Sequence, residues 1–214
     1  IYKYYADSKF DELNDLVVKS SKYQFFIVIL ISYPLLFETE FILDLWLKDY
    51  PYSAIIFTQL AIILSIVDSL SYSLMAAVLA TGKIKLYSIL VSGLIILNIP
   101  FSYYFLQYDL PPYIIVVISI LISIIAFFVR FYFYSKYYKR SKLKVLKKIL
   151  IPSVLVLVSS LILPYIVIIN YQPSILRFII SSFTCIISVI LFTYLFGLKA
   201  KEKNILKTII KNYN

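Results

Sequence analysis

Long apolar runs separated by short polar segments make up most of the chain. A helix of about 20 apolar residues crosses the hydrocarbon core of a bilayer, and it satisfies its backbone polar groups within one segment. The runs are too long for soluble strands, and they lack the alternation of a membrane β-barrel. They therefore predict an all-α fold, a polytopic transmembrane helix bundle with six spans. The predicted spans are Tyr23–Leu47, Ala54–Ala80, Leu86–Leu106, Tyr113–Phe133, Ile149–Ile169 and Ile175–Leu198.

The first run is interrupted by charge. Its charge-free part ends at Phe37, and Glu38 and Glu40 follow within an otherwise apolar pattern. Pro34 lacks the N–H that a helix interior requires, so we expect one long helix that bends there and carries its acidic end to an interface. Upstream, residues 1–22 place apolar positions at helical spacing among charges. This predicts an amphipathic cytoplasmic helix that lies on the membrane surface or packs beneath the bundle.

The net charge of +10 is carried mainly by the connections between the apolar runs, which indicates membrane topology rather than nucleic-acid binding. If all six runs cross, the lysine-rich connections fall on one side, and the positive-inside rule makes that side cytoplasmic. We accordingly expect a multi-pass protein of the cell inner (plasma) membrane with both ends in the cytoplasm. The predicted organisation is residues 1–22 as a cytoplasmic helix or loop, 23–134 as four spans, 135–148 as a basic cytoplasmic loop, 149–198 as two spans and 199–214 as a basic cytoplasmic tail.

Composition narrows the function classes. Hydrophobic residues make up 62% of the 214 and charged residues 15%, against roughly 45–50% and about 25% in soluble domains. This excess excludes a soluble enzyme, because one core of this size cannot bury so much apolar surface. The chain has no histidine, one cysteine and three glycines. Histidine-based catalysis, cysteine metal clusters and glycine-rich phosphate loops are therefore excluded, and we expect no enzymatic activity, metal or cofactor.

Polar side chains inside the predicted spans are the candidate functional residues. Asp68 lies near the middle of the second span, where a carboxylate that faces lipid costs about 2.5–3.5 kcal/mol. Gln59 precedes it on the same helix. Four polar residues recur at i, i+3, i+4 and i+7, which is one face of a helix: Ser65, Asp68, Ser69 and Tyr72. The stripe predicts the wall of a water-filled cavity on a substrate or ion pathway, with interhelical hydrogen bonding as the alternative.

Three further charged residues are candidates for this pathway. Glu38 and Glu40 are two residues apart and point to different faces, so we expect at least one to face the interior; the alternative is that both reach the outer interface. Arg130 lies toward the cytoplasmic end of the fourth span. Snorkelling is the default interpretation of an arginine at that depth, and phosphate binding or pairing with a distant carboxylate is the alternative.

Four stretches carry a family resemblance. They are YYADSKFDELNDLVVKSSKY before the first span, ILDLWLKDYPYSA after it, AAVLATGKIKLYS after the second and ILNIPFSYYFLQYDLPP at the end of the third. With the spacing of the first four spans, they cover roughly residues 1–140. In this order they resemble the C-terminal half of Wzx-type polysaccharide (O-antigen) flippases, in the multidrug/oligosaccharidyl-lipid/polysaccharide exporter superfamily. The ATGK and LWL elements are the most specific parts.

The resemblance implies that the six spans are the last six of fourteen. The N-terminal half of the same protein would then be missing, which agrees with a chain that begins at Ile1. It implies a transporter that passes undecaprenyl-diphosphate-linked oligosaccharide across the inner membrane for polysaccharide biosynthesis, including lipopolysaccharide. The expected partners are the lipid bilayer, this lipid-linked oligosaccharide and a coupling proton or sodium ion, with no nucleic acid. Asp68 is the candidate coupling group, on grounds of its depth and chemistry.

Other functions are weighed against this one. A drug/cation antiporter of the same superfamily, or a flippase for a cell-wall lipid precursor, would have the same hydropathy. A membrane-embedded glycan polymerase or ligase usually has a large outer loop with catalytic polar residues, whereas the connections here are short: 48–53, 107–112 and 170–174. A structural membrane subunit is a further alternative.

Overall fold

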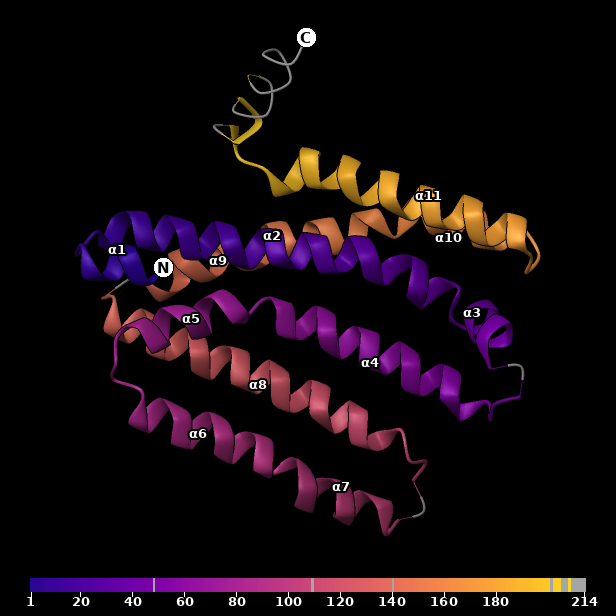
Figure 1. The fold of residues 1–214 in the computed structure, drawn as a ribbon, viewed down its shortest axis with the longest axis horizontal. Helices are drawn as coiled ribbons and strands as arrows, with labels where there is room; N and C mark the ends of the chain where they lie inside the picture. The colour runs from indigo at the N-terminus through magenta and orange to yellow at the C-terminus, as the bar shows by residue number, and fades with distance from the viewer. Residues whose placement is uncertain (48, 109, 140, 201, 205–207, 209–214) are drawn as a thin grey trace.

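A computed structural model describes residues 1–47, 49–108, 110–139, 141–200, 202–204 and 208 (Figure 1). Within these residues every regular element is helical and none is a strand, so the all-α prediction is confirmed. The elements are α1 (Tyr2–Ala6), α2 (Phe10–Phe37), α3 (Thr39–Trp46), α4 (Ser53–Ser69), α5 (Tyr72–Ala80), α6 (Lys85–Ile96), α7 (Asn98–Leu106), α8 (Ile114–Tyr137), α9 (Lys142–Ser160), α10 (Ile162–Asn170), α11 (Ile175–Phe192) and the π-helix η1 (Thr193–Gly197).

Within the described residues, five helices are long and apolar enough to cross a membrane, or six if one bent pair counts as a single span. The bent pair is α4 and α5, whose axes meet at 41°. This arrangement fits a multi-pass membrane protein. The five helical segments that are long and apolar enough within the described residues are Phe10–Phe37, Lys85–Leu106, Ile114–Tyr137, Lys142–Asn170 and Ile175–Gly197.

The helices lie side by side, and their connections alternate between the two ends of the bundle (Figure 1). The α5–α6 and α8–α9 connections lie at one end, on the left of the view. The α3–α4, α7–α8 and α10–α11 connections lie at the other. The lysine-rich connections therefore share an end, which we call the basic end.

Helix α2 is the central element of the packing. It contacts α4 and α5 on one side and α9 and α11 on the other. Its first half packs Leu13 and Val17 into a core shared with α5, α8 and α9. Its second half packs Phe26 and Ile29 into a second core with α9 and α11. Both halves of α2 therefore lie at the centre of the bundle.

The predicted boundaries around α2 and α9 differ from those observed. Residues 1–22 contain the short helix α1 and the first half of α2, which runs without a break from Phe10 to Phe37 and buries Leu13 completely. The cause is that its apolar face continues in phase into the span. The predicted loop over residues 135–148 shrinks to the turn between Tyr137 and Lys142, since the lysines beyond it belong to the first turns of α9.

The first span is interrupted at Glu38, between α2 and α3. Pro34 lies inside α2, and its own carbonyl still accepts the amide N–H of Glu38 at 3.1 Å. Helix α3 begins directly after this residue. The break places the Glu38 side chain at a joint between two helices.

Pro164 breaks the fifth span three residues upstream, at Leu161, because its ring cannot accommodate the carbonyl of Ser160. The carbonyls released there are satisfied by other helices. Ser188 of α11 donates to the Ser160 carbonyl at 2.8 Å. Tyr33 of α2 donates to the Leu157 carbonyl at 2.7 Å. An interruption in one helix thus joins three helices by hydrogen bonds.

Labelling of introduced cysteines tests which end faces the cytoplasm. We expect Ser174→Cys to react with a membrane-impermeant maleimide added outside the cell, and Ser141→Cys to react only after permeabilisation, because the basic end carries the lysines. The native Cys185 is buried and serves as an unreactive background. The reversed labelling pattern would overturn the assigned orientation.

Candidate functional site

A polar cavity lies between α4, α8 and the joint of α6 with α7. Its volume is about 220 Å³, room for roughly seven water molecules at about 30 Å³ each. We call it the polar cavity. Its lining residues are Leu64, Asp68, Ile95, Asn98, Ser119, Ile122, Ser123, Ala126 and Arg130.

Helix α8 forms the longest wall of the polar cavity. Ser119, Ser123, Ala126 and Arg130 follow at i, i+4, i+7 and i+11, which is one face of a helix. From Ser119 to Arg130 this face extends about 16 Å at the rise of 1.5 Å per residue. This face of α8 thus presents two hydroxyls, an alanine and a guanidinium to the cavity.

Asp68 occupies the wall opposite this face. It lies one residue before the end of α4, and its carboxylate Oδ1 accepts a hydrogen bond from the Ser123 hydroxyl. The carboxylate therefore faces protein and the cavity, as the cost of placing it in lipid requires. The prediction that Asp68 lies at a cavity agrees with this geometry.

The third wall begins at the joint between α6 and α7. Pro100 breaks the helix at Leu97, and Asn98 starts the new helix. The Asn98 amide donates to the Ser119 hydroxyl at 2.6 Å. Its carbonyl oxygen accepts from the Ser102 hydroxyl at 2.7 Å. The proline-induced break thus places an amide in the cavity wall.

Arg130 is held inside the bundle. Its Nη1 donates to the Ser71 hydroxyl at 2.5 Å, and that hydroxyl donates to the backbone carbonyl of Asp68 at 2.9 Å. Its Nε is buried without a hydrogen-bond partner among the described residues. Arg130 is half-buried, and its head group bonds within the bundle. The guanidinium anchors α8 to the α4–α5 bend through one of its five N–H donors.

The predicted stripe of Ser65, Asp68, Ser69 and Tyr72 does not line one cavity. The α4–α5 bend interrupts it: the amides of Leu70 and Ser71 bond three residues back instead of four. Such a tight turn advances the side chains by more than the 100° per residue of an α-helix. Tyr72 therefore emerges 51% exposed on the next helix.

The other members of the stripe have local roles. The Ser69 hydroxyl donates to the Ile66 carbonyl at 2.7 Å, replacing the amide bond lost at the bend. Ser65 is exposed and bonds the Ala61 carbonyl. Gln59 reaches across to the Leu36 carbonyl of α2 at 3.4 Å. The structure places none of the three in the polar cavity.

Glu38 forms a separate buried ion pair. Its Oε2 accepts from Nη2 of Arg177 at 2.8 Å and from Nε at 3.3 Å, joining the α2–α3 break to the first turn of α11. The Glu38 side chain is fully buried and that of Arg177 is 12% exposed. Glu40 is exposed, so the two glutamates do face different ways. The pair lies among the connections opposite the basic end, away from the polar cavity.

Sequence reasoning missed three residues of the cavity wall: Asn98, Ser119 and Ser123. The spacing of Ser119, Ser123 and Arg130 along one helix was the available signal. It is weaker than a charge, because single serines are common in membrane helices, where they bond to their own backbone.

Among the polar side chains of the cavity, Asp68, Asn98, Ser119 and Ser123 offer oxygen atoms and none offers sulfur, which suits a proton, water or a small hard cation better than a soft metal. No cluster of three or more histidine, cysteine, aspartate or glutamate side chains occurs among the described residues. No family model, curated protein or solved structure matches the chain.

Proposed function

We propose that this chain is part of a membrane transporter that translocates undecaprenyl-diphosphate-linked oligosaccharide, with the polar cavity as its ion-coupling site. The observation that carries the proposal is a carboxylate and a guanidinium in one cavity among membrane-length helices. Charged groups at such depth are costly, and they mark ion or substrate pathways in membrane proteins. The resemblance to Wzx-type flippases supplies the cargo.

The polar cavity is large enough for the coupling ion but too small for the glycan. At about 220 Å³ the polar cavity holds an ion and a few waters, not an oligosaccharide. We propose that the glycan and its diphosphate pass through a larger space completed by a missing N-terminal half. This space is needed because charged and hydroxylated groups cannot enter hydrocarbon unaided.

Asp68 and the α4–α5 bend connect ion binding to motion in this proposal. Asp68 adjoins the bend, and Arg130 bonds Ser71 within it. Neutralising the Asp68 carboxylate, by a proton or a cation, changes the charge balance against Arg130. The bend is the flexible element that responds, since its shortened turns are weaker than regular helix.

One observation favours a second candidate, the drug/cation antiporter. A small cavity with one carboxylate and two hydroxyls would suit a compact cation as cargo. The polymerase or ligase alternative is disfavoured, because the helix ends leave only short connections from Trp46 to Ser53, Leu106 to Ile114 and Asn170 to Ile175.

The test is deletion of the gene, followed by complementation with the full-length protein. We expect the deletion strain to lose surface polysaccharide and to accumulate lipid-linked oligosaccharide on the cytoplasmic leaflet, and the full-length protein to restore both. Unchanged polysaccharide together with increased sensitivity to cationic drugs would overturn the flippase in favour of the antiporter.

A further inference from the structure

Two hollows meet at the basic end, away from the polar cavity. The first, which we call the lysine pocket, has a volume of about 260 Å³ and contains Lys22, Lys147, Lys148 and Lys199. The second, which we call the apolar groove, has a volume of about 440 Å³ and lies between α2 and the end of α11. Leu198 lines both hollows.

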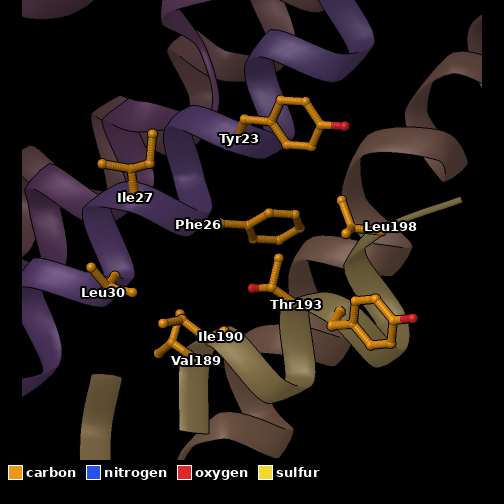
Figure 2. Close-up of a pocket in the computed structure, with 9 residues that line it drawn as sticks. Tyr23, Phe26, Ile27, Leu30, Val189, Ile190, Thr193 and Leu198 are labelled. Atoms are coloured by element: carbon orange, nitrogen blue, oxygen red, sulfur yellow. The ribbon is translucent and has the colours of Figure 1, made fainter. Parts of the chain in front are cut away.

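Side chains from two helices face each other across the apolar groove (Figure 2). Tyr23, Phe26 and Ile27 of α2 form one wall, and Val189 and Ile190 of α11 form the other. Ile27 and Ile190 are 59% and 57% exposed. This is a surface that hydrocarbon, rather than water, would cover.

The three helical segments around the two hollows share one arrangement: their lysines lie at the basic end, and their apolar residues lie farther along the bundle. On α2, Lys22 is followed by the apolar positions from Tyr23 to Leu30, about 12 Å along the helix at the standard rise. On α9, Lys147 and Lys148 precede Ile151 by one turn. The antiparallel α11 and η1 reach Lys199 only after their apolar residues. A basic pocket followed by an apolar groove is complementary to an amphiphile that has an anionic head group and a hydrocarbon chain.

The charge of the lysine pocket is only partly compensated. Lys22 is 1% exposed, donates to the Gly197 carbonyl at 3.0 Å and lies 3.7 Å from the Glu202 carboxylate. Lys147, Lys148 and Lys199 are exposed. Glu202 also accepts the backbone N–H of Lys199 at 2.7 Å. Asp15 also lies close enough to interact with Lys148 and Lys199, but it is paired with Lys19 at 2.6 Å. Two carboxylates thus face five ammonium groups, and the pocket attracts anions.

Close packing of η1 on α2 holds the junction of the two hollows in place. A Cβ atom at Gly197 would lie 2.8 Å from the Phe26 ring, so this approach requires glycine. The approach also brings the Gly197 carbonyl to Lys22. Beside the junction, the Thr193 hydroxyl lines the groove and is buried without a hydrogen-bond partner among the described residues.

We propose that these two hollows together form a binding site for one anionic phospholipid of the bilayer, with its phosphate in the lysine pocket and an acyl chain in the apolar groove. Basic pockets between membrane helices bind anionic headgroups by this charge complementarity, and each buried methylene adds affinity. The site is independent of the proposed transport function and uses none of the residues of the polar cavity.

The test measures lipid retained by the full chain in native mass spectrometry, with phosphatidylglycerol and phosphatidylcholine of identical acyl chains. We expect the wild type to prefer phosphatidylglycerol, and the triple variant Lys147→Gln/Lys148→Gln/Lys199→Gln to lose about tenfold or more of that preference. The matched control is Lys83→Gln/Lys85→Gln/Lys136→Gln. It removes equal charge at the same end, outside the lysine pocket, and should keep the preference.

A second pair of variants tests the groove. Ile190→Trp fills it and is expected to reduce retention of phosphatidylglycerol severalfold, whereas Ile187→Trp, an equally exposed position outside the groove, should not. Equal losses in both lysine triples, or in both tryptophan variants, would overturn the site. Displacement of the lipid by millimolar inorganic phosphate would also overturn it, in favour of a free-phosphate site.

Discussion

Replacing Glu38 with alanine is expected to destabilise the protein by roughly 3–5 kcal/mol, because it leaves a buried arginine without its counter-charge. Arg177 has two nitrogens on Glu38 Oε2, and its remaining bond, to the Tyr171 carbonyl, is long at 3.4 Å. The measurement is SDS-induced unfolding of the detergent-solubilised protein, followed by circular dichroism.

Two further variants show whether that loss comes from the ion pair. Glu40→Ala, two residues away and exposed, should change the unfolding free energy by less than about 0.5 kcal/mol. The double variant Glu38→Leu/Arg177→Met removes both charges and should be markedly more stable than Glu38→Ala. If Glu38→Ala unfolds like the wild type, or the double variant is the least stable of all, the ion pair does not hold α11 to the α2–α3 break.

Asp68→Asn is expected to reduce transport by the full-length protein about tenfold or more while leaving membrane insertion intact. Asparagine keeps an oxygen that accepts the Ser123 hydroxyl, so the contact between α4 and α8 survives. It cannot take up a proton or offer a negative charge to a cation. The measurement is surface polysaccharide per inserted protein in a complemented deletion strain.

Two variants show whether charge is the cause. Asp68→Glu restores the carboxylate and should recover part of the transport. Asp49→Asn alters an exposed aspartate outside the cavity and should transport as the wild type does. Normal transport by Asp68→Asn would remove Asp68 from the mechanism, even if the chain is a flippase.

Much of the architecture was predictable from hydropathy. The apolar runs reappear as membrane-length helices, with the α4–α5 pair as the one uncertain crossing. The boundaries were less predictable. The helix continues through Lys22 because the ammonium of this lysine donates to the carbonyl of Gly197, 175 residues away. The sequence does not indicate that contact. From the sequence alone, a lysine beside an apolar run marks the end of a membrane span, since an unpaired lysine is most stable in water.

The candidate site was predictable in part. The cost of a charge in lipid singled out Asp68, and the same reasoning singled out Glu38 and Arg130. Their partners were not predictable. Arg130 pairs with a serine at the bend, and Glu38 pairs with an arginine 139 residues distant. Helical spacing relates residues within one helix and carries no information on which helices become neighbours.

Length and hydrophobicity settled that this is a bundle of membrane-length helices, because backbone groups in hydrocarbon have few other ways to be satisfied. Packing settled where those helices break and what the breaks create. Pro100 and Pro164 each end a regular turn, but neighbouring helices decide whether the released groups line a cavity, as at Asn98, or bind a neighbour, as at Ser160. Satisfying a buried polar group requires a partner in space, and the position of that partner follows from the packed bundle as a whole.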